Sequence, residues 1–198
     1  TLPKKEDMLP SPLSPYAVTK LAGEYYCRVF QQVYGLPTVC LRYFNVYGPR
    51  QPYDSAYMDV IMHFLNRIEK DEAPLVRGDG SATVDLVYVE DVAQANIIAM
   101  KSKVTNEFFN VASGKEITLK NLAKLLIRLK GKEGQLYPKY ERMDSGLVTR
   151  RSGDPARARE MLGFVAKTSV EEGMQKVIAW REELTNKGIN VVTPGSFN

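Results

Sequence analysis

Residue types that build metal centres, disulfide frameworks and hydrolytic triads are scarce in this 198-residue sequence. Its two cysteines, Cys27 and Cys40, each stand in an apolar segment, which is typical of free thiols in a reducing compartment rather than of a disulfide framework. His63 is the single histidine and has no second histidine or cysteine at ligand spacing, so the sequence predicts no metal site. A hydrolytic triad is also disfavoured, because this one histidine would have to supply the base.

Long apolar runs and local concentrations of one charge are absent as well. No apolar run approaches the roughly 20 residues that span a bilayer, and no signal peptide opens the sequence. The net charge of +4 is spread along the chain, and the most basic stretch, residues 120–132, has the pattern of a solvated helix face. We therefore expect a cytoplasmic protein whose partners include neither a membrane nor a nucleic acid.

What the sequence does contain is an alternation of helix and strand patterns, in a length that suits one domain or two interleaved lobes. Apolar periodicity and capping residues predict helices over residues 16–34, 56–70, 90–100, 119–130, 155–162 and 170–184. Strands are predicted over residues 38–44, 75–77, 84–89, 107–112 and 137–142, and loops over residues 45–52 and 147–153. The first strand lacks clean alternation, as in a parallel sheet covered on both faces, so the predicted class is α/β.

The first helix carries a tyrosine and a lysine one turn apart. Ser14 suits the N-cap and Pro15 the first helical position, which puts Tyr16 in the first turn and Lys20 on the same face. The positive end of the helix dipole and a nearby ammonium would both favour a phenolate, and this is how a tyrosine becomes a general acid/base. The simpler alternative is a chance pair of common residues, with Lys20 bound instead to Glu24, four residues on.

Asn45 begins the loop that leaves the carboxyl end of the strand predicted at residues 38–44. Ligands bind at this edge in open α/β sheets, where a side-chain amide can donate to a phosphate oxygen. The alternative is a turn residue whose side chain satisfies its own backbone.

Several segments match one family in order and spacing. They are Ser14-Pro15-Tyr16-(x3)-Lys20, residues 42–50 (Arg-Tyr-Phe-Asn-Val-Tyr-Gly-Pro-Arg), Gly78-Asp79-Gly80, residues 87–92, residues 109–114, and Leu162-Gly163-Phe164 ahead of Glu171-Glu172-Gly173. Over residues 3–184 the sequence thereby resembles the carboxyl-terminal part of an extended short-chain dehydrogenase/reductase of the NAD-dependent nucleotide-sugar epimerase/dehydratase type. The resemblance implies the carboxyl-terminal part of a Rossmann-type doubly wound parallel sheet, plus a smaller mixed α/β substrate-binding lobe.

The resemblance also implies a mechanism in which a sugar carbon is oxidised with NAD and hydride is then returned to it. Tyr16 would abstract the hydroxyl proton, and Lys20 would hold the nicotinamide ribose hydroxyls and stabilise the Tyr16 phenolate. Tyr43 and Val46 would line the nicotinamide pocket. The implied activity is that of a UDP-sugar 4-epimerase.

Substrate-binding residues and a partner follow from the same resemblance. Asn45 would bind the diphosphate of the nucleotide-sugar, Val76 would lie in the edge that packs on the base, and Arg151 would bind phosphate. A guanidinium suits that role because it forms two bonds at once, although the adjacent Arg150 is a competitor. The broad apolar surface of the helix starting at Tyr16 predicts a homodimer interface.

Two departures from the family pattern qualify these expectations. Val84 stands where many relatives carry a phosphate-binding arginine. The sequence also has no Gly-x-x-Gly-x-x-Gly turn for a pyrophosphate, and the Ser/Thr that assists the tyrosine would precede Thr1. We therefore expect an active full-length parent, with the 198 residues alone inactive.

The expected domain division assigns residues 1–46 and 88–112 to the NAD-binding domain and residues 47–87 and 113–186 to the substrate lobe, with residues 187–198 as a frayed tail. Two other functions remain open from the sequence. One is a sugar-nucleotide 4,6-dehydratase or decarboxylase on the same scaffold, and the other is a non-catalytic binding module that has kept the fold.

Overall fold

The computed structural model describes residues 1–53, 59–142 and 150–191. The predicted helix residues 56–58 and loop residues 147–149 lie outside these ranges. The helices within them are α1 (Pro15–Tyr34), α2 (Val60–Ile68), α3 (Val89–Lys101), α4 (Leu119–Leu129), α5 (Ala156–Leu162) and α6 (Val170–Asn186). The strands are β1 (Val39–Tyr43), β2 (Asn45–Tyr47), β3 (Leu75–Arg77), β4 (Thr83–Tyr88), β5 (Glu107–Val111), β6 (Glu116–Thr118), β7 (Lys139–Glu141) and β8 (Arg150–Arg151).

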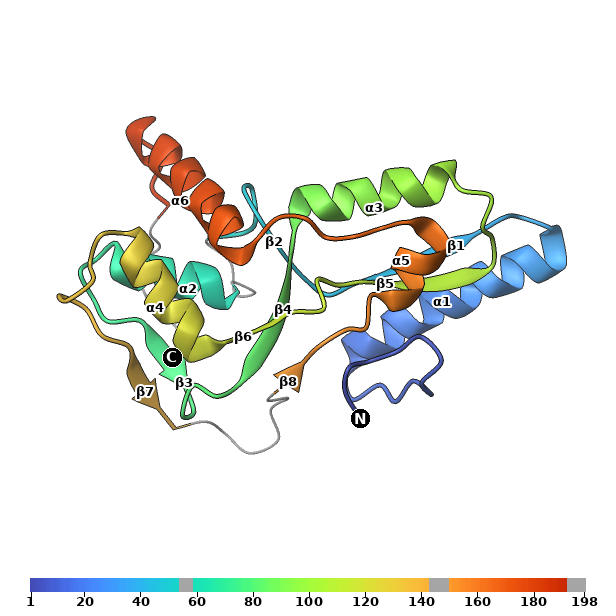
Figure 1. Ribbon diagram of the computed structural model, residues 1–198, viewed down its shortest axis with the longest axis horizontal. Coiled ribbons are helices and arrows are strands. Elements are labelled where there is room, and N and C mark those ends of the chain that lie inside the picture. The colour runs from blue at the N-terminus through green and yellow to red at the C-terminus, as the bar shows by residue number, and fades with distance from the viewer. Residues whose placement is uncertain (54–58, 143–149, 192–198) are drawn as a thin grey trace.

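Most strand pairs are parallel, which confirms the α/β prediction. β1 pairs with β5, β2 with β4, β3 with β7 and β8 with β4, all in parallel, whereas β6 is antiparallel to β4. In Figure 1, α1 and α3 lie on opposite sides of the β1–β5 pair, and β4 connects this part of the molecule to the part that contains α2, α4 and α6. The structure is therefore a parallel βα arrangement with a second, helix-rich lobe.

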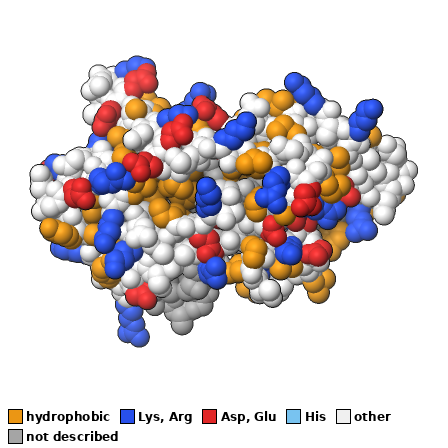
Figure 2. All heavy atoms as spheres, viewed as in Figure 1, with side chains coloured by type: hydrophobic (Ala, Val, Ile, Leu, Met, Phe, Trp, Pro, Cys, Tyr) orange, Lys and Arg blue, Asp and Glu red, His pale blue; other side chains and the backbone are white. Residues whose placement is uncertain are grey.

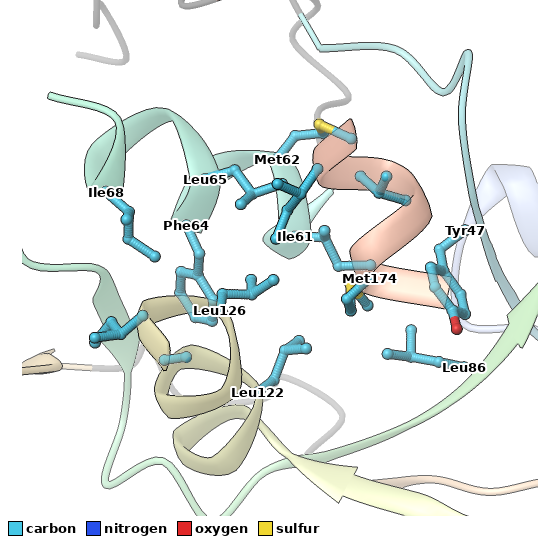
Figure 3. Close-up of a cluster of buried hydrophobic side chains, with 14 of the residues drawn as sticks. Tyr47, Ile61, Met62, Phe64, Leu65, Ile68, Leu86, Leu122, Leu126 and Met174 are labelled. Carbon is cyan, nitrogen blue, oxygen red and sulfur yellow. The ribbon is translucent and has the colours of Figure 1, made fainter. Parts of the chain in front are cut away.

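Two clusters of buried apolar side chains correspond to these two parts. The larger joins α2, α4 and α6 to β4, and Figure 3 shows Phe64, Leu122, Leu126 and Met174 converging in it. At its edge Gly173 leaves room for a ring, because a Cβ there would stand 2.1 Å from the Tyr47 hydroxyl. The smaller cluster lies between β1, β5, α3 and α5, and its buried members are Val87, Val92, Ala95, Phe109, Val111, Ala158 and Phe164.

The smaller cluster contains residues from both of the predicted domains. α5 packs on β5 and contributes Ala158 to this cluster, although residues 113–186 were all assigned to the substrate lobe. Val87 and Phe164, also assigned to the substrate lobe, lie in the smaller cluster, whereas Tyr88, assigned to the NAD-binding domain, lies in the larger one. The domain boundaries therefore remain a proposal.

Three predicted segments differ from the structure. Residues 45–47 form β2 rather than the start of a loop, because the chain shifts at Phe44 from pairing with β5 to pairing with β4. Arg150 and Arg151 form β8 rather than a loop, and β6 was not predicted. In the expected tail, Val191 is buried and its carbonyl accepts a hydrogen bond from Arg181, while residues 192–198 lie outside the described ranges.

The surface carries both charges. Figure 2 shows Lys and Arg side chains interspersed with Asp and Glu over the visible face, without an extended area of one sign. Within the described residues, no helix is long and apolar enough to cross a membrane.

Candidate active site

The first two turns of α1 bring Tyr16 and Lys20 together. Ser14 caps the helix, since its Oγ accepts a hydrogen bond from the Ala17 N–H at 3.1 Å, and Pro15 occupies the first position. The Lys20 Nζ lies 5.2 Å from the centre of the Tyr16 ring, and the ring is 71% exposed. The ammonium therefore lies over the ring of Tyr16, at a surface that a ligand can reach.

The alternative pairing of Lys20 with Glu24 is not formed. Both Glu24 carboxylate oxygens accept from the Arg42 guanidinium, with Nε and Nη2 each 2.7 Å away. α1 returns toward β1 through residues 35–38, so its first turn lies toward the carboxyl end of the strand (Figure 1). This is the edge at which open α/β sheets bind ligands.

Tyr43 and Val46, predicted to line one pocket, border two different hollows. The Tyr43 hydroxyl donates to Asn96 Oδ1 at 2.8 Å, in a hollow of about 460 Å³ between β1 and α3. Val46 lines a hollow of about 550 Å³ at the carboxyl ends of β2 and β4. The separation arises because the chain changes pairing strand at Phe44, between the two residues.

Asn45 uses its amide to bind the neighbouring strand. The Asn45 Nδ2 donates to the Asp85 carbonyl at 2.9 Å. Asn45 is therefore not a turn residue bound to its own backbone, and one of its two amide hydrogens is already used. The buried Asp85 carboxylate accepts from the N–H groups of Ser113, Gly114 and Gly153. This carboxylate fixes the segment that follows β8 against β4.

The structure distinguishes the two candidate phosphate-binding arginines. Arg150 Nε donates to both carboxylate oxygens of Glu116, at 2.9 and 3.1 Å. Arg151 is exposed and forms no ion pair within the described ranges. It pairs with Val84 in the β4–β8 register. The geometry thus favours Arg151 over Arg150 as the available guanidinium.

Val76 lies apart from the other predicted site residues. Its side chain is fully buried in the larger apolar cluster, and its strand pairs with β7. The side chain accordingly packs in the protein core. The predicted contact between Val76 and a nucleotide base stays a prediction. It requires either that β3 rearranges or that the β3 backbone, rather than the Val76 side chain, contacts the base.

Sequence reasoning missed a group of side chains around the Val46 hollow. Tyr88 lines it, and the Lys176 Nζ lies 4.9 Å from the Tyr88 ring centre and 3.5 Å from a Glu90 carboxylate oxygen. Burial is the main cause that raises the pKa of Tyr88. Tyr88 belongs to the matched segment of residues 87–92, which could have suggested it as a site residue. Lys176 belongs to α6, 88 positions later, and nothing in the neighbouring sequence indicates that it lies near Tyr88.

The donor set does not favour metal chemistry in the part of the chain that is described. There, no group of three or more His, Cys, Asp or Glu side chains could hold an ion. The side chains gathered at the strand ends are instead phenols, amides and cations. They suit proton transfer and the binding of hydroxyl or phosphate oxygens.

Comparison with known proteins identifies the class. Residues 1–112 match the model of the NAD dependent epimerase/dehydratase family, and the chain belongs to this family. A Methanocaldococcus jannaschii protein provisionally named UDP-glucose 4-epimerase is 37% identical over 179 residues, which are 90% of this chain and 57% of that protein. The chain thus spans about half the length of the curated relatives it matches.

Solved structures give the same result. UDP-glucose 4-epimerase from Thermotoga maritima, solved with UDP-glucose, is 37% identical with a TM-score of 0.83, and the match covers 89% of this chain and 56% of that one. UDP-glucuronic acid 4-epimerase from Bacillus cereus, solved with UDP-glucuronic acid and NAD, is 29% identical with a TM-score of 0.80, covering 91% and 56%. The fold of this chain is therefore that of part of a sugar-nucleotide epimerase.

Proposed function

We propose that this chain is the catalytic tyrosine and substrate-binding portion of a longer NAD-dependent UDP-sugar 4-epimerase, which we call the parent enzyme. The observation that carries the proposal is the approach of Lys20 to Tyr16 across the first two turns of α1, 5.2 Å from ammonium to ring centre. The family match and the two epimerase structures support it.

Each side chain has a chemical role in this proposal. Bound NAD would take a hydride from a sugar carbon and later return it. Tyr16 would take the proton of the hydroxyl on that carbon and give it back, and Lys20 would bind the ribose hydroxyls of the cofactor and stabilise the Tyr16 phenolate. Tyr43 and Val46 would contact the nicotinamide end from the two hollows that they line.

The nucleotide-sugar would lie beside β4, next to Asn45, which pairs with Leu86, and Arg151, which pairs with Val84. The second Asn45 amide hydrogen and the Arg151 guanidinium would donate to the diphosphate, a recognition that suits a planar fork of donors. A UDP-sugar is the favoured class, because the three similar proteins described above are named as epimerases of UDP-sugars. The Val76 backbone would border the base.

The position of the chain within the parent enzyme is also a proposal. We place it in the carboxyl-terminal part, because the Tyr16–Lys20 helix is followed by the substrate lobe and the 198 residues contain no Gly-x-x-Gly-x-x-Gly turn. The family match falls on residues 1–112 of this chain and does not support this placement. A cytoplasmic location is proposed from the free thiols Cys27 and Cys40.

A homodimer through α1 completes the proposal. No residue of α1 is buried. The exposed large apolar side chains of this helix are Tyr16, Val18, Tyr25, Tyr26, Val29, Phe30, Val33 and Tyr34. A surface of this kind marks an interaction site. We expect the parent enzyme to sediment as a dimer and a Phe30→Asp variant as a monomer; a strictly monomeric native enzyme would contradict the assignment.

Isotope labelling tests the proposed chemistry. With UDP-[4-²H]glucose as substrate, the hydride removed from C4 returns to the same carbon, so the epimerised product should retain the deuterium when analysed by mass spectrometry. Deuterium lost to water would show that the hydrogen leaves as a proton and would exclude the NAD route. Product without epimerisation at C4 would point to another reaction on this scaffold.

A further inference from the structure

A bidentate ion pair joins the centre of α1 to β1, one helical turn beyond Lys20. Arg42 donates through Nε and Nη2 to Glu24, and its Nη1 donates to the Glu6 carbonyl at 3.4 Å. The guanidinium also lies 5.3 Å from the centre of the Phe108 ring. The Glu24 and Arg42 side chains are only 20% and 25% exposed, and the hydrogen bonds to Glu24 are the largest cause that raises the pKa of Arg42.

The position of this pair matters because Glu24 is the acidic residue best placed to capture Lys20. The two residues are four apart on one helix, the spacing at which side chains of opposite charge pair. In the structure Glu24 turns instead to β1, and Lys20 forms no ion pair within the described residues. Its ammonium therefore remains over Tyr16.

We propose that Arg42 is a positioning residue that holds Glu24 away from Lys20 and so keeps the Lys20 ammonium available to Tyr16 and to a bound ligand. The link to a ligand rests on the proposed function, whereas the effect on Lys20 belongs to this chain alone. Without Arg42, a half-buried carboxylate would lack its partner and would turn to a cation within reach on its own helix. Lys20 is one such cation and Arg28, four residues on in the other direction, is the second.

The reactivity of Lys20 tests the proposal without cofactor or activity. Acetic anhydride acylates a free amine, and pairing with a carboxylate lowers the fraction of free amine. The acetylation rate of Lys20 would be measured by peptide mass spectrometry on the 198-residue chain, relative to the exposed Lys101. Arg42→Met should slow the acetylation of Lys20 by about 1.4- to 2.3-fold, as expected for a helical i,i+4 pair, and Arg42→Met with Glu24→Gln should restore the native rate.

Three controls separate positioning from simple loss of structure. Glu24→Gln alone should leave the acetylation rate of Lys20 unchanged. Arg42→Lys should give a rate close to the native one, because a cation still faces Glu24. Arg28→Met removes an arginine equally close to Glu24 along the helix but not bonded to it, and should have no effect. Circular dichroism would check the fold of each variant.

Several outcomes would overturn the proposal. Faster acetylation in Glu24→Gln would show that Glu24 already pairs with Lys20. A native rate in folded Arg42→Met would show that the released carboxylate goes elsewhere, and failure of the double variant to restore the rate would leave only a structural role for Arg42. If Arg42→Met does not fold, Arg42→Gln takes its place, with the same expected results. None of these results depends on NAD or on a sugar substrate, so they stand apart from any failure of the epimerase proposal.

Discussion

Replacing Tyr16 with phenylalanine in the parent enzyme is expected to lower turnover by roughly 10²- to 10⁴-fold, the usual contribution of a positioned general acid/base. The variant keeps the ring that Lys20 approaches and removes only the hydroxyl that exchanges the proton. Because the ring is exposed, the loss of one oxygen should leave the stability of the protein almost unchanged. Steady-state kinetics should show the loss in kcat, with a smaller change in KM.

Tyr26 supplies a matched control for this prediction. It lies on the same helix, is 68% exposed against 71% for Tyr16, and has no part in the proposed chemistry. Tyr26→Phe should keep turnover within about twofold of the native value, as for surface changes with small energetic effects. Equal turnover in the Tyr16 and Tyr26 variants would mean that Tyr16 is only a surface residue of α1.

Replacing Arg181 with methionine should destabilise the chain by about 3–5 kcal/mol, the usual cost of breaking a buried ion pair from one side. Arg181 is fully buried and donates to Glu69 through Nε and Nη2, at 3.1 and 2.5 Å. It also donates to Asn66 Oδ1 at 2.7 Å and to the Val191 carbonyl at 3.1 Å. The variant leaves the mostly buried Glu69 carboxylate without this partner. Denaturation by urea would measure the change in unfolding free energy.

Two companion variants sharpen the interpretation of that loss. Arg181→Met combined with Glu69→Met should recover much of the stability, because the buried charge is then removed rather than left without its partner. Lys187→Met removes the exposed pair with Glu183 at the C-terminal end of α6 and should leave the stability almost unchanged. A cost for Arg181→Met as small as that for Lys187→Met would show that the buried pair contributes little to stability.

Local signals allowed the sequence to predict α1 and its candidate site. Ser14 and Pro15 start the helix and Gly35 ends it, with φ at 65° and its N–H bonded to the Gln31 carbonyl. Both ends depend on residues within one turn of the terminus, and the 3.6-residue period then places Tyr16 and Lys20 on one face. The prediction of convergence follows from helix geometry alone.

Features that depend on distant residues could not be predicted in the same way. The shift at Phe44 depends on where β4 and β5 lie, so the sequence could not show that Tyr43 and Val46 border different hollows. The pairing of Glu24 with Arg42 rather than Lys20 depends on how α1 packs on β1. Lys176 reaches Tyr88 only through the tertiary packing of α6. In each case, a contact between separate elements overrides the local pattern.

We propose that this chain holds a catalytic half-site and that the cofactor-binding turn belongs to another part of the parent enzyme. Isothermal titration of NAD into the isolated 198 residues tests it most directly. Tyr16 and Lys20 would reach only the nicotinamide ribose, and no glycine-rich turn is present to bind the pyrophosphate at a helix N-terminus. We expect a dissociation constant no tighter than about 1 mM, equivalent to roughly 4 kcal/mol of binding free energy. Saturable binding in the micromolar range would contradict it.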